Sequence, residues 1–97
     1  MPTREAYDTF FRDWKGLTPG QIVRFLKAVA EFAEDLDRDG LPRAGLRVKR
    51  VQGTDDVWEL TWAPDGRATF EYGKEILPGK RHVAWRRIGT HAILDTP

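Results

Sequence analysis

Hydrophobic and polar positions alternate along residues 57–88, and this alternation is the strongest structural signal in the chain. Every second residue there is apolar or aromatic, which is the period of a strand with one buried and one exposed face. The apolar positions are Trp58, Leu60, Trp62, Ala68, Phe70, Tyr72, Val83 and Trp85. The pattern predicts three consecutive strands, at residues 57–62, 67–72 and 81–88.

The connections between these strands also have turn signals. Residues 63–66 (Ala-Pro-Asp-Gly) predict a tight hairpin, because proline and an Asp-Gly pair favour the backbone angles of such a turn. Residues 73–80 contain a Pro-Gly pair and predict a looser connection. Upstream, alternation over residues 46–51 predicts one more strand, with Arg47 and Lys49 pointing outward. The sheet is therefore expected to have four strands.

Two helices are predicted before the sheet. Four aromatic rings recur at helical spacing within residues 4–14, so an amphipathic helix is expected there with Thr3 as its N-cap. A second helix is predicted to begin after Thr18. Proline follows this threonine, and Gln21 stands three positions after it, which together form a capping box at a helix start. An apolar stripe then continues over residues 22–36.

The order of these elements predicts an α+β fold in one domain of residues 1–97. Ninety-seven residues suffice for a single hydrophobic core. The apolar stripes of both helices need a surface to cover, and the ring-rich face of the sheet is the one of matching size. We therefore expect two N-terminal helices packed on one face of a four-stranded, mainly antiparallel sheet. The other face would stay exposed and would carry the function.

Amino-acid composition indicates the cellular compartment of the protein, and the two parts of the chain differ in charge. The chain has no cysteine, which is typical of a reducing compartment and excludes disulfides and thiolate metal sites. It has no secretory signal and no apolar run of about 18 residues, so a cytoplasmic protein without a membrane segment is expected. Residues 1–40 carry six Lys/Arg and eight Asp/Glu, while residues 41–97 carry ten and seven. The second part of the chain is therefore the more basic.

Sequence motifs for common cofactors are missing. The chain has no phosphate-binding loop, dinucleotide fingerprint, zinc signature or nucleophile elbow. Asp35, Asp37 and Asp39 alternate before a glycine, as in a calcium loop, but the glutamate that such a loop needs farther on is absent. We therefore predict no metal site and no cofactor.

The exposed face is predicted to be rich in groups that bind phosphate and move protons. Guanidinium groups bind phosphate oxygens in a bidentate manner, and an imidazole exchanges protons near neutral pH. The candidates on this face or just beyond the last strand are Arg47, Lys49, Arg67, His82, Arg86 and His91.

Several segments in this order resemble the RelE/ParE superfamily of small bacterial toxins from type II toxin–antitoxin pairs. They are DWKGL, GLRVKRVQG, VWELTW, DGRATFEY and HVAWRRIGTHAIL. The resemblance extends over nearly the whole chain and depends on the order of elements more than on any one residue. It implies a RelE-like fold and, for the RelE-like branch, a metal-independent endoribonuclease that cuts messenger RNA on the ribosome.

The resemblance also implies roles for particular residues. Arg67 matches the arginine that opens the third strand in the family, and His91 matches the catalytic position after the last strand. Attack of a ribose 2′-hydroxyl on its phosphorus builds charge that Arg67 and Arg86 could stabilise, and His91 could protonate the leaving 5′-oxygen. Glu59 could act as the general base; the alternative is a surface ion pair with Arg67 or Arg47.

Further basic residues are expected to hold the RNA, and other functions stay open. The predicted RNA-binding residues are Arg47, Lys49, Arg50, His82 and Arg87. One alternative is a ParE-like inhibitor of DNA gyrase without nuclease activity. Another is a non-toxic homologue that only binds an antitoxin. In each case an antitoxin chain is expected as partner, because exposed sheet edges accept a strand or a helix.

Overall fold

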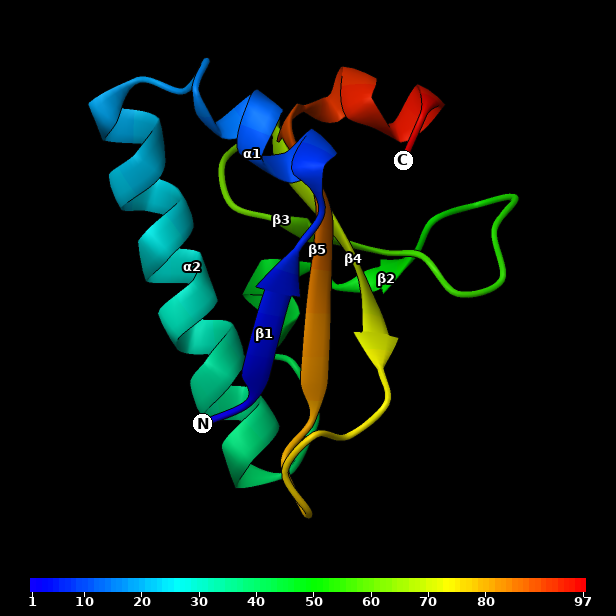
Figure 1. Ribbon diagram of the computed structural model, residues 1–97. Helices are drawn as coiled ribbons and strands as arrows, with labels where there is room; N and C mark the ends of the chain where they lie inside the picture. Colours follow the sequence, from blue (N-terminus) through cyan, green and yellow to red (C-terminus); the bar gives the residue numbers. More distant parts are fainter.

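The computed structural model describes residues 1–97, which form two α-helices, two short 3-10 helices and one five-stranded sheet. The elements in chain order are β1 (Thr3–Ala6), α1 (Asp8–Trp14), α2 (Pro19–Arg38), η1 (Ala44–Leu46), β2 (Lys49–Arg50), β3 (Trp58–Thr61), β4 (Gly66–Gly73), β5 (His82–Thr90) and η2 (His91–Asp95). The strand order is β1-β5-β4-β3-β2, and only the β1–β5 pair is parallel (Figure 1). The predicted α+β fold with two helices and a mainly antiparallel sheet is confirmed, with one strand more than expected.

Helix α2 covers one face of the sheet along its whole length (Figure 1). Its start is the predicted capping box: the Gln21 N–H donates to the Thr18 hydroxyl at 3.2 Å, and the Thr18 N–H donates to the Gln21 side-chain oxygen at 2.8 Å. The buried stripe of α2 includes Phe25, Phe32 and Leu36. None of the helices is both long enough and apolar enough to span a membrane.

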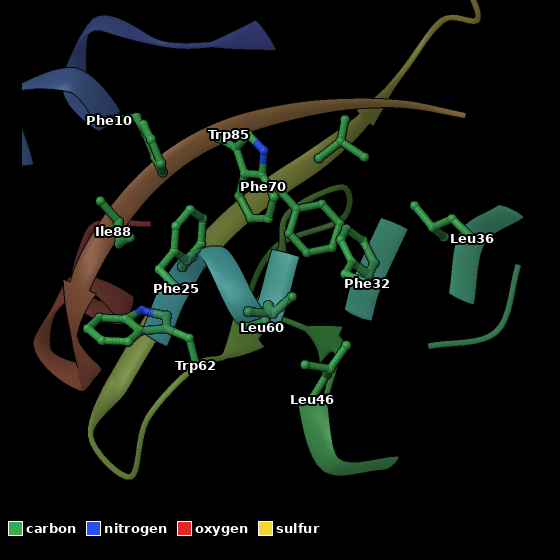
Figure 2. Packing of buried hydrophobic residues seen from close by; sticks show 13 residues of the cluster. Phe10, Phe25, Phe32, Leu36, Leu46, Leu60, Trp62, Phe70, Trp85 and Ile88 are labelled. Atoms are coloured by element: carbon green, nitrogen blue, oxygen red, sulfur yellow. The ribbon is translucent and has the colours of Figure 1, made fainter. Parts of the chain in front are cut away.

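The core between α2 and the sheet is a cluster of interlocking rings (Figure 2). Ring centroids lie 5.3 Å apart for Phe25 and Trp85, 5.1 Å for Phe32 and Phe70, and 5.3 Å for Phe70 and Trp85. The planes of these pairs are inclined, which is the favoured geometry for aromatic contacts. The alternating apolar positions of β3, β4 and β5 thus form the buried face, as their period predicted.

The N-terminal segment differs from the expected helix over residues 4–14. Residues Thr3–Ala6 form strand β1, which pairs in parallel with residues 82–85 of β5, and α1 begins only at Asp8. Beyond β1, α1 side chains bond the unpaired edge of β5. The Thr9 hydroxyl donates to the Arg86 carbonyl at 2.7 Å, and the Ile88 N–H donates to the Asp13 carboxylate at 3.1 Å. Helix α1 therefore lies at the sheet edge.

The predicted strand at residues 46–51 is also shorter in the structure. Leu46 ends the 3-10 helix η1, Arg47 adopts a left-handed backbone conformation with φ of 49°, and β2 contains only Lys49 and Arg50. Leu46 and Val51 are both buried although they stand five positions apart, so the segment does not follow the period of a strand. The short β2 forms one edge of the sheet.

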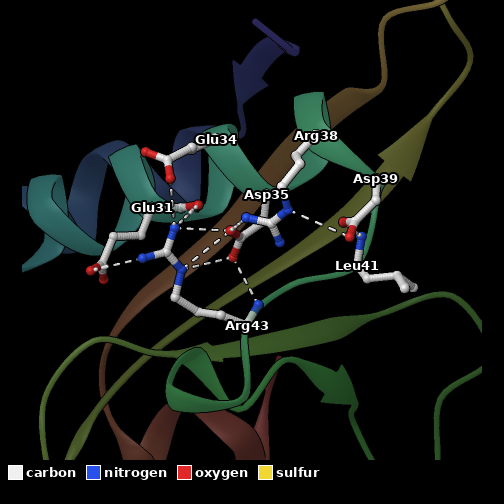
Figure 3. A network of polar contacts seen from close by, with 7 residues as sticks. All are labelled: Glu31, Glu34, Asp35, Arg38, Asp39, Leu41 and Arg43. Atoms are coloured by element: carbon white, nitrogen blue, oxygen red, sulfur yellow. Dashed lines mark hydrogen bonds and ion pairs between the residues drawn. The ribbon is translucent and has the colours of Figure 1, made fainter.

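A buried carboxylate fixes the connection from α2 to η1 (Figure 3). Asp35 is fully buried; it accepts hydrogen bonds from the Arg43 backbone N–H at 2.7 Å and from the Arg43 guanidinium at 2.9 Å. Arg38 adds a contact at 3.1 Å. The hydrogen bonds from Arg43 hold the pKa of Asp35 well below its usual range against the opposing effect of burial. Asp35 thus serves as an anchor for Arg43 and so positions the segment that leads into β2.

Candidate functional site

The sheet face opposite α2 contains a hollow of about 580 Å³ at the junction of β2, β3 and η2. We call it the Glu59 hollow. Its lining residues are Lys49, Arg50, Val51, Gln52, Glu59, His91 and Leu94. Strand alternation explains the face: Leu60 of β3 points into the core, so its neighbour Glu59 points the other way, directly across from Lys49 of β2.

Glu59 is the central carboxylate of this hollow, and it is nearly buried, with 5% of its surface exposed. Its one ionic partner is Arg67, whose Nε lies 3.9 Å from Oε1. That separation exceeds the usual length of a hydrogen bond. The predicted alternative of an ion pair with Arg67 is therefore present as a loose contact.

Arg67 is held by the turn that precedes it. Its Nη1 donates to the backbone carbonyls of Ala63, Pro64 and Gly66 at 3.4, 3.3 and 3.0 Å. The tight turn depends on Gly66, because an added Cβ there would lie 2.6 Å from the Trp62 ring. The predicted hairpin thus fixes a guanidinium beside Glu59 before any ligand arrives, which lowers the entropy cost of binding an anion.

His91 lies on the wall of the same hollow and is exposed. It is the first residue of η2, which follows β5 directly, and the Thr90 hydroxyl accepts the Ala92 N–H at 3.4 Å to start this turn. The structure gives His91 no hydrogen bond and no ion pair. Its imidazole is therefore not bound to another group of the protein.

Arg86 and Arg87, in contrast, are occupied by other protein groups. A bulge opposite the Thr69–Phe70 step leaves Arg86 without a partner in the β4–β5 ladder. Arg86 lies 3.3 Å from the Glu71 carboxylate and donates to the Pro97 carbonyl at 3.1 Å. Arg87 forms a bidentate pair with Asp13 at 2.9 and 3.0 Å. The expectation that both arginines face RNA is therefore not supported, because each is held in an ion pair with a carboxylate of the protein.

Electrostatics agree with a structural role for the Arg87 pair. Burial by itself would raise the pKa of Asp13, but hydrogen bonds from Arg87 and from the Ile88 N–H outweigh it and lower the pKa. The same pair raises the pKa of Arg87. A guanidinium that is already paired in this way loses an ion pair when it turns to a phosphate.

His82 lies at the opposite end of β5 from His91 and is buried, with 5% of its surface exposed. The Thr3 hydroxyl and His82 Nδ1 are 2.7 Å apart, and Nε2 lies 3.7 Å from Glu5. The prediction of an RNA contact from His82 is contradicted by this burial. Its ring instead links β5 to the strand that the sequence pattern did not reveal.

The remaining basic candidates lie on two sides of β2. Lys49 and Arg50 line the Glu59 hollow, and the Arg50 guanidinium lies 5.4 Å from the centre of the Trp58 ring. Arg47 instead lines a separate groove next to α2, which Arg67 also lines. The structure thus gathers Lys49, Arg50, Glu59 and His91, with Arg67 beside them, out of nine predicted residues.

Three residues of the hollow, Val51, Gln52 and Leu94, were not predicted. Val51 and Gln52 follow β2, and their place after a basic strand was the only available signal. Leu94 belongs to η2, a segment without hydrophobic periodicity in the sequence. No group of three or more His, Cys, Asp or Glu side chains suited to holding a metal ion forms in the chain.

Known structures share this arrangement of strands and helices. The chain is similar to YafQ from E. coli in the structure of a YafQ mutant, with 17% identity, 97% of this chain and 98% of that chain covered, and a TM-score of 0.66. A chain of the RelB–RelE antitoxin–toxin complex from Methanococcus jannaschii is 14% identical, with 94% of each chain covered and a TM-score of 0.62. A chain of the E. coli DinJ–YafQ complex is 18% identical, with 97% and 98% covered and a TM-score of 0.60.

These comparisons show that the chain has the RelE/YafQ toxin fold. The fold that the sequence segments suggested is confirmed. No protein-family model and no curated protein matches the sequence. At such low identities a shared fold does not carry a shared activity, so function has to be argued from the Glu59 hollow itself.

Proposed function

We propose that this protein is the toxin of a type II toxin–antitoxin pair and a metal-independent endoribonuclease that cleaves messenger RNA on the ribosome. One observation carries the proposal. Within a RelE/YafQ fold, Glu59 and His91 line one hollow, and Arg67 contacts the Glu59 carboxylate from the end of the neighbouring strand. A base, a proton donor and a fixed cation are the three groups that transesterification of RNA requires.

The proposed reaction is attack by a ribose 2′-hydroxyl on the adjacent phosphorus. Glu59 accepts the proton of that hydroxyl as the P–O bond to the 2′-oxygen forms. Arg67 and Lys49 stabilise the negative charge that develops on the phosphoryl oxygens. His91 donates a proton to the 5′-oxygen as its bond to phosphorus breaks. The products are a 2′,3′-cyclic phosphate and a free 5′-hydroxyl.

Burial and charge fit these assignments. Glu59 is largely removed from solvent, whereas His91 is exposed and can recover a proton from water after each turnover. Arg67 is held by three backbone carbonyls, so its charge is in place before the substrate binds. Lys49 stands directly across from Glu59 in the β2–β3 pair. We propose further that Arg50 and its neighbour Lys49 hold the phosphate backbone.

An antitoxin chain is the proposed partner. RelE and YafQ were crystallised in RelB–RelE and DinJ–YafQ complexes. In this chain an apolar groove of about 490 Å³ lies between β1, α1 and α2, with Phe11 and Leu26 more than half exposed on it. Apolar patches of this kind, beside an open edge strand such as β1, favour docking of another chain. A toxin of this kind would act in the cytoplasm.

The test is brief induction in bacteria of the wild-type chain, Arg67→Ala, His91→Ala and the control Arg12→Ala. Arg12 is an exposed arginine outside the Glu59 hollow. The wild type and the control should stop growth and produce messenger RNA fragments with 5′-hydroxyl ends at fixed codon positions. Both site variants should lose this cleavage while they stay folded.

Two results would contradict the proposal. One is cleavage at wild-type level by both Arg67→Ala and His91→Ala, which would remove the catalytic assignment. The other is growth arrest with a DNA damage response and intact transcripts, which would support a gyrase inhibitor. Sequencing of RNA ends after induction separates these results from the proposed cleavage.

A further inference from the structure

A second groove, of about 650 Å³, lies between α2, η1 and the β3–β4 turn. We call it the α2 groove. Its charged lining consists of five cations, Arg24, Lys27, Arg43, Arg47 and Arg67, and a single carboxylate, Glu31. Only four of its 13 lining residues are hydrophobic, so the groove favours a polar, anionic ligand over an apolar one.

Two of the five cations already have protein partners. Arg43 forms an ion pair with Asp35 and also lies 3.3 Å from Glu31. The charges of Arg43 and Glu31 therefore neutralise each other. Arg67 is bonded to the turn carbonyls and contacts Glu59. The carboxylate of the groove is therefore not available to the remaining cations.

Arg24, Lys27 and Arg47 are exposed and take part in none of the ion pairs of the structure. Arg24 and Lys27 are three positions apart on α2, so they project from the same side of the helix. Arg47 approaches from the other wall, held by its left-handed backbone conformation with φ of 49°. Three unpaired cations that surround one groove repel one another, and an anion between them removes that repulsion.

The α2 groove and the Glu59 hollow meet at Arg67. Arg67 and Thr61 line the groove, and Arg67 also contacts Glu59, which lines the hollow. Strand β2 pairs with β3 only at Trp58 and Glu59, so the edge of β3 near Thr61 is not covered by it. The two sites are therefore neighbours that the Arg67–Glu59 contact joins.

On the basis of the function proposed above, we infer that the α2 groove binds phosphates of the same single-stranded RNA whose cleaved bond lies in the Glu59 hollow. Arg24, Lys27 and Arg47 are positioning residues in this assignment, because they bind the chain away from the reacting atoms. A repeating phosphate backbone provides several anions at once, which suits cations placed on opposite walls.

The binding experiment uses the His91→Ala chain, which keeps every cation but should not cleave, and a fluorescein-labelled single-stranded RNA. Its affinity is measured by anisotropy at several salt concentrations and compared with the same chain carrying Arg24→Gln and Lys27→Gln. The matched control carries Arg12→Gln and Lys74→Gln, which remove the same charge from exposed residues that line neither site.

Loss of two phosphate contacts should lower the slope of log Kd against log salt by about 1.4, because each contact with a single strand contributes about 0.7. The affinity at low salt should fall about tenfold or more, while the control keeps the slope of the parent chain. A separate Arg47→Gln variant should lower the slope by about 0.7 and tests the opposite wall of the groove. Equal slopes for the groove variant and the control would overturn the inference.

Kinetics separate this inference from the proposed function. With His91 present, the groove variant should show a raised KM for RNA and an unchanged kcat. Cleavage with an unchanged KM would overturn the groove assignment and leave the nuclease in place. RNA binding through the groove without cleavage by the wild type would overturn the nuclease and leave the groove in place.

Loss of binding to polyglutamate, with RNA binding unchanged, would make the groove a docking surface for an acidic protein and would also overturn the inference.

Discussion

The sheet face opposite α2 has two regions with the same kinds of charged side chain. In one region these side chains are paired with other protein groups, and in the other they are largely unpaired. At β5, Arg86 and Arg87 are paired with Glu71 and Asp13. At the Glu59 hollow, Lys49 and His91 have no ionic partner, and Glu59 has only the 3.9 Å contact with Arg67. The residue type did not distinguish these regions, and the presence or absence of a neighbouring partner did. Before function is assigned, the basic residues on one face therefore have to be divided into those that pair within the protein and those that are free to bind a ligand.

Glu59→Gln should give the largest effect if the hollow is catalytic. The amide keeps the shape of the side chain but cannot accept the proton of the 2′-hydroxyl, so cleavage should fall by about 10²–10⁴-fold. Stability should change little, because Glu59 has no short hydrogen bond to lose. Single-turnover cleavage of a labelled RNA measures the rate, and thermal denaturation serves as control. An unchanged rate would leave Glu59 as a structural ion pair only.

Asp35→Asn should give the largest loss of stability, although Asp35 lies outside both regions. It removes the fully buried charge that Arg43 and Arg38 share and replaces their charge-assisted hydrogen bonds by weaker bonds to a neutral amide. The Tm should fall on the order of 15 °C. Glu34→Gln, at an exposed partner of Arg43, is the matched control and should change the Tm by only a few degrees.

Lowering the pH should destabilise the fold, because it protonates the paired carboxylates. The pKa values of Asp13 and Asp35 are lowered in the folded chain, so both contribute stability that is present above their unfolded pKa of about 3.9 and is lost as the pH falls below it. The Tm should therefore be nearly constant between pH 5 and 7 and drop toward pH 3, to a smaller extent in Asp35→Asn. An identical acid response in the variant would show that Asp35 does not contribute to it.

Asp13→Asn tests the paired region directly. It replaces the charge-assisted bidentate contact with Arg87 by weaker bonds and should cost about 2 kcal/mol of folding free energy. Arg87→Lys should not restore the contact, because an ammonium cannot form the paired geometry. Denaturant titrations measure both variants. Cleavage per folded molecule should stay at the wild-type level, and a large loss would show that this region takes part in the reaction.

Thr90→Ala should give the smallest effect. The Thr90 hydroxyl accepts the Ala92 N–H at 3.4 Å, a long bond at the start of η2, and its loss should cost about 0.5 kcal/mol. Because His91 follows Thr90, the cleavage rate should fall only a few-fold through poorer placement of the imidazole. A loss as large as that of His91→Ala would mean that η2 has to be rigid for activity.

Local chemistry made α2 and the β3–β4 hairpin predictable from sequence. The capping box at Thr18 and the turn before Arg67 form within a few residues, so neighbouring side chains determine them. Strand β1 could not be found in this way, because its four residues acquire their partners only from β5, far along the chain. Its residues lie next to the rings of α1, and the helical spacing of those rings concealed the strand.

The residue types of the site could be predicted from the sequence. Which of these side chains are free to bind a ligand could be predicted less well. Alternation placed Lys49, Glu59 and Arg67 on one face, and the structure brings them together. The same reasoning included Arg86, whose pairing with Glu71 leaves no trace in a period of two. Strict alternation would have put Arg87 on the face of Trp85, and the bulge at Arg86 moves it to the opposite face, where it pairs with Asp13. His82 was misplaced for a related reason: the strand that buries it was not recognised.

The parallel pairing of β1 with β5 determines when the molecule can become complete during its synthesis. Thr3 and His82, which meet at one end of this pair, are 79 positions apart. A contact between such distant residues forms late, since the chain in between has to be made first. The ribosome therefore releases the first strand long before its neighbour exists, and His91 follows still later. On the proposed function, a growing chain could not cleave RNA before residues 82–91 have been made.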